Sequence, residues 1–352
     1  MKLAPGKILV IRLSSLGDIL MTTPLVRGLK HQFPQCQIDY LTGSGYRELE
    51  ECNPYIDNLI ILPAETRIGQ ILSEAGRLSS NDYNIVIDLH GSIRSRLIRA
   101  RIHASTTLTF RKYRMQRAIL IITKRSYYPD DRSMAQWMLD SARQLGVEDD
   151  GDGLDLFLKS ETEERIGNII ATEMPKDRSR LIAFAPGARH NTKRWLIERW
   201  GELAEILIED PSITIIILGS MEDQEYGDEI IARIPGHGFN VAGRFSMMES
   251  AAMISHCQTV ITNDSGIMHI ASALQIPVVA IFGPTVRAFG FEPFRIPFRI
   301  VEQSLPCRPC SSKGSAKCPL GHFRCMRDIT SQDVFSAYTD LVSCRPNLTK
   351  VL

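Results

Sequence analysis

The sequence lacks long hydrophobic runs and any excess of charge of one sign. The apolar run before Arg12 has four residues, too short for the core of a secretory signal. The uncharged stretch 265–286 contains two prolines and predicts a helix, a turn and a strand rather than a membrane span. A net charge of +1 implies no attraction of the whole molecule to nucleic acid. We therefore expect a cytosolic protein, in which the eight cysteines are thiols.

One motif of nucleotide chemistry is missing, and one of sugar chemistry occurs only outside the strand-to-helix turns. The first strand-to-helix turn, 12–18, is not GxGxxG, which disfavours a nicotinamide-dependent dehydrogenase. The Asp-x-Asp pattern of metal-dependent sugar transferases occurs at 150–152, inside a polar segment that we interpret as a linker. We therefore predict no metal requirement for catalysis.

What the chain does contain is an alternation of β-branched runs and amphipathic stretches, in two series. Strands at this spacing, apolar on both faces, predict parallel βαβ units covered by helices. The expected strands are 7–13, 36–41, 58–62, 83–89, 105–110, 180–186, 213–219, 259–264 and 278–284. The expected helices are 19–32, 68–78, 92–102, 133–145, 161–173, 195–208, 222–234, 247–256 and 266–275.

An acidic, glycine-rich segment that begins at Gly146 separates the two series. A length of 352 residues also suits two domains better than one. We predict an α/β fold of two Rossmann-like domains, 1–158 and 159–352, with parallel sheets that face a central cleft; the last helix is free to pack back on the N-terminal domain. Such sheets bind ligands beyond the carboxyl ends of their strands, so the strand-to-helix turns are the candidate sites.

The first turn runs from the strand 7–13 into a helix that we expect Asp18 to open. Serine and aspartate at a helix start accept hydrogen bonds from backbone N–H groups, so a cap is one interpretation. A general base at the carboxyl end of a strand is the other.

The loop 185–195 combines a Pro-Gly turn with Arg189, Lys193 and Arg194 before a helix. Loop amides and a lysine at a helix N-terminus bind phosphate, and a solvated basic loop is the alternative. The turn 218–225 places carboxylates at a helix start, where the helix dipole favours them and where they also suit ribose hydroxyls.

The sharpest signal is the turn 259–274, in which a strand leads through Asn-Asp-Ser-Gly into a helix. Its hydroxyl and bare amides suit an anion, and its carboxylate suits sugar hydroxyls. A packed histidine is the alternative for the imidazole one turn into the helix. The candidates here are Asp264, Ser265, Gly266 and His269.

Between Asp88 and Asp130 there is no acidic residue, but there are ten cations. They are Arg94, Arg96, Arg99, Arg101, Arg111, Lys112, Arg114, Arg117, Lys124 and Arg125. Apolar residues flanked by charge within 111–125 suit an anionic membrane surface. Nucleic acid is the rival interpretation, although no nucleic-acid motif is present, and a solvated face is the third.

Four cysteines lie within 19 residues, and a histidine, His322, stands between the last two. They are Cys307, Cys310, Cys318 and Cys325. A tetrahedral zinc site is one interpretation of this spacing. We favour packed thiols over a structural metal, because a short Cys-x-x-Cys pair occurs at one end only, and a redox bridge is the third option.

Six segments in chain order resemble the ADP-heptose:lipopolysaccharide heptosyltransferase family. They are SSLGD near the start, DLHGSIRS, PGARHNTKRW, GSMEDQE, NDSGIMHIASAL and the cysteine segment. The resemblance spans residues 7 to about 330. NDSGIMH is most similar to the branch that adds the second heptose, heptosyltransferase II.

The resemblance implies a GT-B fold and inverting transfer of L-glycero-D-manno-heptose from ADP-heptose to the inner core of lipopolysaccharide. It makes Asp18 the general base and Lys193 the group that stabilises the leaving diphosphate. The expected donor contacts are Gly187, Arg189, Thr192, Gly219, Glu222, Asp223, Asp264, Ser265, Gly266 and His269, with Glu222 and Asp223 as alternatives for the ribose. The expected acceptor contacts are Ser15, Gly17, Arg94, Arg111, Arg114 and Arg117.

ADP-heptose is then a substrate, and no cofactor is implied. The expected partners are ADP-heptose, a Kdo–lipid A or inner-core acceptor and the cytoplasmic face of the inner membrane, with no nucleic acid. Family members with a threonine pair before the lysine use it on phosphate, whereas Ala188 and Arg189 occupy those places here. Two alternatives keep the fold. One is a transferase of another nucleotide sugar in cell-envelope glycan synthesis. The other is a non-catalytic nucleotide-sugar or lipid-binding module, and the presence of both Asp18 and Lys193 disfavours it.

Overall fold

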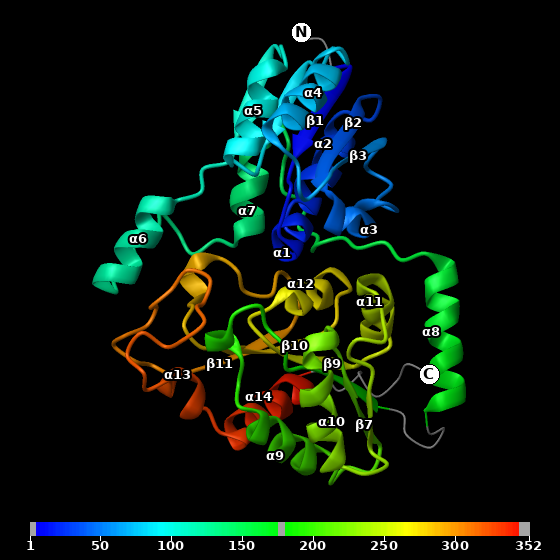
Figure 1. The fold of residues 1–352 in the computed structure, drawn as a ribbon, viewed down its shortest axis with the longest axis vertical. Coiled ribbons are helices and arrows are strands. Elements are labelled where there is room, and N and C mark those ends of the chain that lie inside the picture. The colour runs from blue at the N-terminus through cyan, green and yellow to red at the C-terminus, as the bar shows by residue number, and fades with distance from the viewer. Residues whose placement is uncertain (1–4, 175–179, 345–352) are drawn as a thin grey trace. The chain divides into compact units, whose positions relative to one another are not determined.

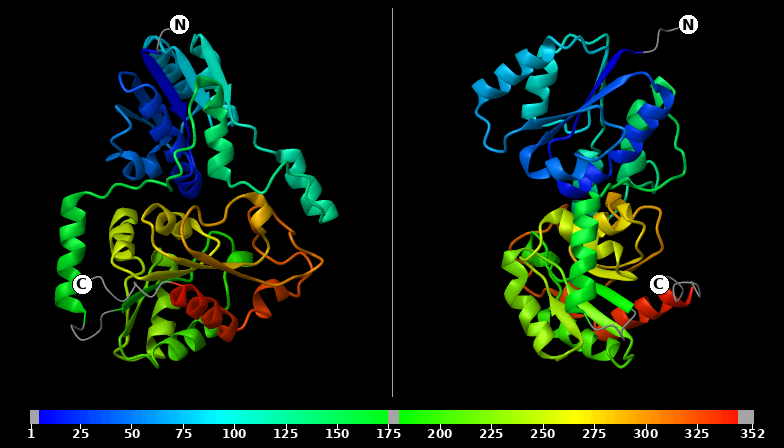
Figure 2. Two further views of the ribbon diagram at one scale, coloured as in Figure 1. Left: turned by 180° about the vertical axis from the view of Figure 1, so that it is seen from behind. Right: turned by 90° about the vertical axis from the view of Figure 1, so that its right-hand side faces the viewer.

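The chain folds into two compact units, each built on its own parallel sheet (Figures 1 and 2). The structure, a computed structural model, describes residues 5–174 and 180–344. Of these, the first unit contains 5–112 and 132–157, and the second contains the rest. No helix in the described ranges is long and apolar enough to cross a bilayer.

The first unit has a five-stranded parallel sheet in the order β3-β2-β1-β4-β5. Its strands are β1 (Lys7–Ile11), β2 (Gln37–Gly43), β3 (Asn58–Leu62), β4 (Ile85–Asp88) and β5 (Thr106–Thr109). Its helices are α1 (Leu16–Leu20), α2 (Thr23–Gln32), α3 (Arg47–Glu50), α4 (Ile68–Ser79), α5 (Ile93–Arg101) and α7 (Met134–Leu139). The central strand β1 is buried from Ile8 to Ile11, as expected for a strand with helices over both faces.

The second unit has a six-stranded parallel sheet in the order β11-β10-β9-β6-β7-β8. Its strands are β6 (Arg180–Ala185), β7 (Ile213–Ile217), β8 (Gly238–Asn240), β9 (Thr259–Asn263), β10 (Val278–Phe282) and β11 (Phe298–Glu302). Its helices are α6 (Arg114–Thr123), α8 (Ser160–Glu173), α9 (Ile197–Leu207), α10 (Gln224–Ala232), α11 (Met247–Ser255), α12 (Gly266–Ala273), α13 (Arg324–Arg327) and α14 (Ser331–Ser343). The last helix, α14, packs on α9, β10 and β11.

These two sheets confirm the predicted fold class of two Rossmann-like α/β domains. The expected helix 19–32 is wrong in detail, because α1 ends at Leu20 and α2 begins at Thr23. Pro24 explains the break: it lacks an N–H group and its ring clashes with the carbonyl four residues back, but it is tolerated in the first turn of α2. The second half of the expected helix 133–145 is a 3-10 helix.

A buried carboxyl group lies in the first unit, at the end of α3. Glu50 is 1% exposed, and its Oε2 accepts a hydrogen bond of 2.7 Å from Asn53 Nδ2. Burial raises the pKa of the Glu50 carboxyl to about 8, because the charged form would lose its hydration. Glu50 is therefore uncharged in the folded protein near neutral pH.

We expect the Glu50→Gln variant to gain stability over the wild type as the pH rises. In the wild type, the Glu50 carboxyl has a pKa of about 8 in the folded state and 4.5 in the unfolded chain. Its protonated form therefore contributes fully to the free energy of unfolding below pH 4.5, and that contribution is lost as the pH rises to about 8. Urea unfolding at pH 5.5 and pH 8 measures the effect, at most about 1.4 kcal/mol per pH unit. Glu48→Gln, exposed on the same helix, is the control. Equal pH dependence in all three proteins would show that Glu50 is ionised.

Candidate active site

Each sheet has one point at which the strand order reverses. In the first unit it lies between β1 and β4, where Ile11 pairs with Asp88. In the second it lies between β6 and β9, where Ala185 pairs with Thr262. Doubly wound sheets bind ligands beyond the carboxyl ends of the strands at such points. Most of the predicted site residues lie in the loops at these two points.

At the first point, the guanidinium of Arg12 holds the carboxylate of Asp18. Arg12 NH2 lies 2.6 Å from Asp18 Oδ1, and Arg12 is fixed by hydrogen bonds to the carbonyls of Ser14 (2.9 Å) and Leu89 (2.5 Å). The other carboxylate oxygen, Oδ2, accepts hydrogen bonds from the Ser15 hydroxyl (2.7 Å) and backbone N–H (3.2 Å). α1 begins at Leu16, so Asp18 lies within its first turn and does not open it as expected.

These contacts set the charge of Asp18. Burial acts to raise the pKa of this carboxyl, but the charge of Arg12 and the hydrogen bonds from Ser15 outweigh burial, so the pKa lies below its usual value. Asp18 is thus an oriented carboxylate whose side chain keeps 21% of its surface exposed. The contacts with Ser15 agree with the cap interpretation of Asp18. The general-base role of Asp18 stays a prediction.

Asp88 organises the neighbouring loop, which contains the DLHGSIRS segment. It is fully buried, and its carboxylate accepts hydrogen bonds from the N–H groups of His90 (3.0 Å) and Gly91 (2.8 Å) and from the Ser95 hydroxyl (3.1 Å). Burial and the charges of Arg12 and Lys112 lower the pKa of His90 to about 4. A neutral imidazole therefore lies in the loop beside the Asp18 site.

At the second point, Lys193 and Asp264 form an ion pair. Lys193 Nζ lies 2.6 Å from Asp264 Oδ2 and donates a hydrogen bond of 3.0 Å to the Asp264 carbonyl. The Thr285 hydroxyl donates to the same Oδ2 at 2.6 Å. The side chains of Lys193 and Asp264 are 15% and 9% exposed. A cation and a carboxylate predicted from two distant segments are thus in direct contact.

Asn263 ties the loops of this site together. Its side-chain amide donates to the Pro186 carbonyl at 2.7 Å and accepts from the Trp195 N–H at 3.2 Å, so the last residue of β9 holds both ends of the loop after β6. α12 then begins directly after Ser265, whose hydroxyl lies 3.1 Å from that of Thr262. Gly266 is the first helical residue, and its amide is among those that a helix N-terminus offers to an anion.

The structure distinguishes the two ribose candidates. Asp223 is 5% exposed; its Oδ2 accepts from the Ser220 N–H (3.0 Å) and hydroxyl (2.8 Å), and its Oδ1 lies 3.3 Å from Arg194 NH2. A Cβ atom at Gly187 or Gly219 would clash with Asp223, which explains both glycines. Asp223 therefore joins the turns after β6 and β7, whereas Glu222 is exposed beside it.

Three further donor candidates differ in their surroundings. The hydroxyl of Thr192 is buried, donates to the Ser315 carbonyl (3.0 Å) and accepts from its N–H (2.8 Å), so it anchors the cysteine segment. Arg189 is exposed. His269 is 5% exposed within α12, which fits the packed histidine that was the alternative to a ligand contact.

The predicted acceptor residues are divided between the units. Gly17 is buried in α1, and Arg94 on α5 donates to the Ala64 carbonyl at 3.2 Å, both in the first unit. Arg111 also belongs to that unit and is exposed, whereas Arg114 and Arg117 lie on α6 of the second.

In the Asp-x-Asp pattern, Asp150 pairs with Arg27 at 2.6 Å, which makes that carboxylate a structural contact.

The cysteine segment brings one of its thiols to the histidine between the last two cysteines. Cys307 Sγ lies 3.8 Å from His322 Nε2, and all four cysteines are free thiols. Within 5–174 and 180–344, no group of three or more His, Cys, Asp or Glu side chains is arranged to hold a metal ion.

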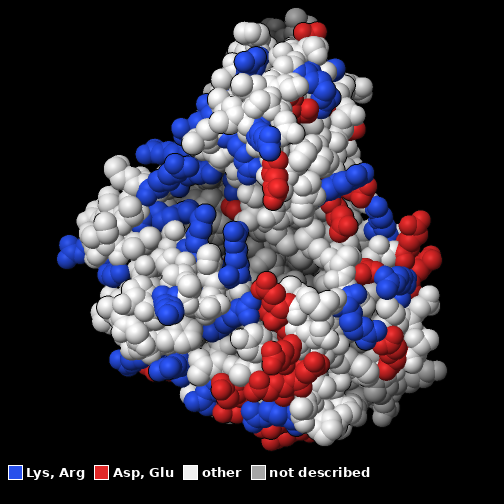
Figure 3. Space-filling view, in the orientation of Figure 1, with Lys and Arg blue, Asp and Glu red and all other residues white. Residues whose placement is uncertain are grey.

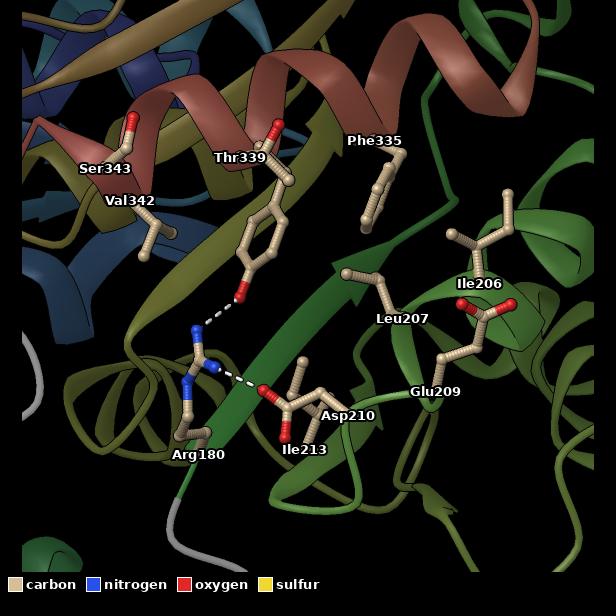
Figure 4. A pocket seen from close by; sticks show the side chains of 11 residues that line it. Arg180, Ile206, Leu207, Glu209, Asp210, Ile213, Phe335, Thr339, Val342 and Ser343 are labelled. Atoms are coloured by element: carbon tan, nitrogen blue, oxygen red, sulfur yellow. Dashed lines mark hydrogen bonds and ion pairs between the residues drawn. The ribbon is translucent and has the colours of Figure 1, made fainter.

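A surface pocket lies elsewhere, at the starts of β6 and β7, where Arg180 contacts Asp210 (2.6 Å) and Tyr338 (2.9 Å) (Figure 4). That edge of the sheet is opposite to the Lys193–Asp264 pair.

Arg12, Asp88, His90 and Thr285 were not predicted as site residues. Asp88 ends β4 and Arg12 follows β1, whereas His90 and Thr285 lie two and three residues beyond the ends of β4 and β10. The strand ends themselves were a usable signal, since β1, β4 and β10 were all expected.

Comparison with known proteins identifies the family. The model of glycosyltransferase family 9 (heptosyltransferase) matches residues 71–320. Lipooligosaccharide heptosyltransferase 2 of Haemophilus ducreyi is 29% identical over 96% of this chain and 100% of its own length. Lipopolysaccharide heptosyltransferase 2 of Salmonella typhimurium is 27% identical over 96% of this chain and 99% of its own.

Solved structures agree with the sequence relatives. The ADP-heptose lipopolysaccharide heptosyltransferase II of Escherichia coli has a TM-score of 0.73 and 25% identity, covering 96% of this chain and 99% of that one. A glycosyltransferase family 9 protein from Veillonella parvula has the same fold, with a TM-score of 0.81 over 97% of this chain and 98% of that one, at 24% identity. The predicted GT-B fold and the resemblance are confirmed, and the chain belongs to glycosyltransferase family 9, the heptosyltransferase family.

Proposed function

We propose that this protein is an inverting transferase that moves L-glycero-D-manno-heptose from ADP-heptose to the inner core of lipopolysaccharide, as a second-heptose enzyme. The observation that carries the proposal is the match over 96% of the chain to relatives named heptosyltransferase 2. The residue clusters where the strand order reverses supply chemistry that such a transfer needs, a carboxylate in one unit and a partly buried cation in the other.

The donor half of the reaction is assigned to the second unit. Lys193 stabilises the negative charge that develops on the leaving diphosphate, together with the amides of Ser265 and Gly266 at the start of α12. Asp264 accepts hydrogen bonds from the heptose hydroxyls. Glu222 holds the ribose, because it is exposed where Asp223 is already engaged by Ser220 and Arg194.

The acceptor half is assigned to the first unit. The acceptor hydroxyl oxygen forms a bond to the anomeric carbon as the bond from that carbon to the diphosphate breaks, and ADP leaves with the electron pair. Asp18 takes the hydroxyl proton. Because Arg12 and Ser15 stabilise its anionic form, Asp18 is a weak base, so the proton moves late, when the attacking oxygen has become acidic.

Arg12 is then a positioning residue, and we expect Arg12→Met to move the acidic limb of the kcat/KM profile to higher pH. Loss of the cation raises the pKa of Asp18, so more of the enzyme holds a protonated, inactive base at low pH. Arg12→Lys keeps a charge and should shift the limb less. A lower rate with an unmoved limb would mean that Arg12 serves only the fold.

The acceptor carries phosphate and carboxylate groups, and the residues proposed to bind them are Arg94 and Arg111, of the first unit, and Arg114 and Arg117, of the second. The Arg117 guanidinium also lies 5.7 Å from the centres of the Phe289 and Phe291 rings, so it serves the fold as well. An acceptor anchored in lipid places the enzyme at the cytoplasmic face of the inner membrane.

Release of ADP from ADP-L-glycero-β-D-manno-heptose tests the function, with Kdo₂–lipid A and its singly heptosylated form as acceptors. We expect turnover only with the heptosylated form. Turnover with Kdo₂–lipid A itself would make this a first-heptose enzyme. Folded protein that binds ADP but is silent with both acceptors would reject the proposal and favour another nucleotide sugar, since the site recognises a diphosphate and diols.

A further inference from the structure

The helix α6 exposes apolar side chains to solvent. Met115 is 68% exposed and Ile122 is 78% exposed, and the exposed Ala118 lies between them. The spacings of three, four and seven residues place all three on one face of a helix. By contrast, Leu120 of the same helix is buried. An apolar stripe of this kind on a surface helix indicates an interaction site.

The opposite side of α6 is fastened to the second unit. The guanidinium of Arg117 lies against the rings of Phe289 and Phe291, and Lys124 Nζ donates a hydrogen bond of 2.7 Å to the Pro309 carbonyl. Leu120 is buried on this side. The helix is therefore anchored while its apolar stripe stays exposed.

The charge around the stripe has one sign. The sequence from 89 to 129 contains no acidic residue, and the exposed Arg114 and Arg125 lie beside Met115 and Ile122. On the face shown in Figure 3, the surface over α6 is uncoloured with blue atoms at its borders and shows no red. Cations beside an apolar stripe are the pattern of helices that lie in the interface of an anionic bilayer.

We propose that α6 docks this protein on an anionic lipid bilayer, with Met115, Ala118 and Ile122 in the acyl boundary and Arg114 and Arg125 on the lipid phosphates. The proposal deepens the proposed function, on which it rests for the lipid-anchored acceptor. A nucleic acid would use the cations but would have no use for exposed methionine and isoleucine side chains. The apolar stripe therefore decides between the two partners.

Co-sedimentation with vesicles tests the proposal. We expect the wild-type chain to bind vesicles of phosphatidylethanolamine and phosphatidylglycerol, less at high salt, and to bind phosphatidylcholine vesicles weakly. The double variant Met115→Ser/Ile122→Ser should lose binding by on the order of tenfold or more, because two apolar side chains no longer enter the bilayer. Ile68→Ser/Leu320→Ser is the matched control, since these residues are 66% and 65% exposed and belong to other segments than α6.

Three outcomes would overturn the docking role: no binding of the wild type to anionic vesicles, equal loss in the control, or tighter binding to single-stranded RNA than to the vesicles. Transfer to a water-soluble, deacylated acceptor separates docking from the reaction. The Met115→Ser/Ile122→Ser variant should keep wild-type kcat with that acceptor, and a matching loss of kcat would mean that the variant damages the fold. If the wild type were inactive with that acceptor while vesicle binding depended on the stripe, the proposed function would fail and the docking surface would stand.

Discussion

The Asp18→Asn variant is expected to lose turnover by on the order of 10²–10⁴-fold. The amide has nearly the shape of the carboxylate but cannot take a proton from the acceptor hydroxyl. ADP binding should stay unchanged, because the residues proposed to bind the donor belong to the other unit. ADP release at saturating donor and acceptor measures turnover, and calorimetry with ADP measures binding.

Stability must be followed with the rate, because the Asp18→Asn substitution would leave the charge of Arg12, which is 4% exposed, without its carboxylate partner. Removal of one partner of a buried ion pair costs about 3–5 kcal/mol. Asp39→Asn is the control for loss of a buried carboxylate: Asp39 is 3% exposed and accepts a hydrogen bond of 2.6 Å from the Tyr83 hydroxyl. Near-normal turnover in folded Asp18→Asn protein would remove Asp18 from the catalytic role.

The sequence was most informative where the local pattern is governed by burial. Strand β3 was predicted at its observed bounds, and the other predicted strands differ by one or two residues at their ends. Central strands such as β1, β7 and β10 consist mostly of Ile, Leu and Val buried on both faces, which makes their pattern clear. Helix α6 was not among the expected helices, although apolar residues flanked by charge were noted within 111–125. Strand β8, with three residues, is too short to leave a pattern.

The sequence predicts which loops carry the candidate site residues, but it does not predict which side chains contact one another there. The candidates Asp18, Lys193 and Asp264 follow from strand ends and from the resemblance. Their partners Arg12 and Thr285 could not be predicted in this way. The contact of Arg12 with Asp18 depends on the conformation of a local turn, and the contact of Thr285 with Asp264 depends on the strand order. The proposal that Glu222 rather than Asp223 holds the ribose likewise rests on a contact that the sequence does not reveal, the packing of Asp223 against Gly187 after β6.

The Lys193→Ala variant is expected to lose both donor affinity and rate, with kcat lower by on the order of 10²–10³-fold. The ammonium group lies 2.6 Å from Asp264 Oδ2 and compensates that carboxylate. Without the ammonium group, the diphosphate approaches an uncompensated negative charge, which weakens binding. The leaving ADP also loses the cation that stabilises its developing charge, which lowers kcat even when the donor saturates the enzyme.

Initial rates over a range of ADP-heptose concentrations separate the two losses. Lys193→Arg keeps a positive charge and should retain most of the donor affinity, while its different geometry lowers kcat by less than alanine does. Lys317→Ala, exposed in the cysteine segment, is the control for the loss of a cation and should match the wild type. A normal kcat in Lys193→Ala at saturating donor would mean that the lysine binds the diphosphate equally well before and during the reaction. The stabilisation of the leaving group would then have to come from the amides at the start of α12.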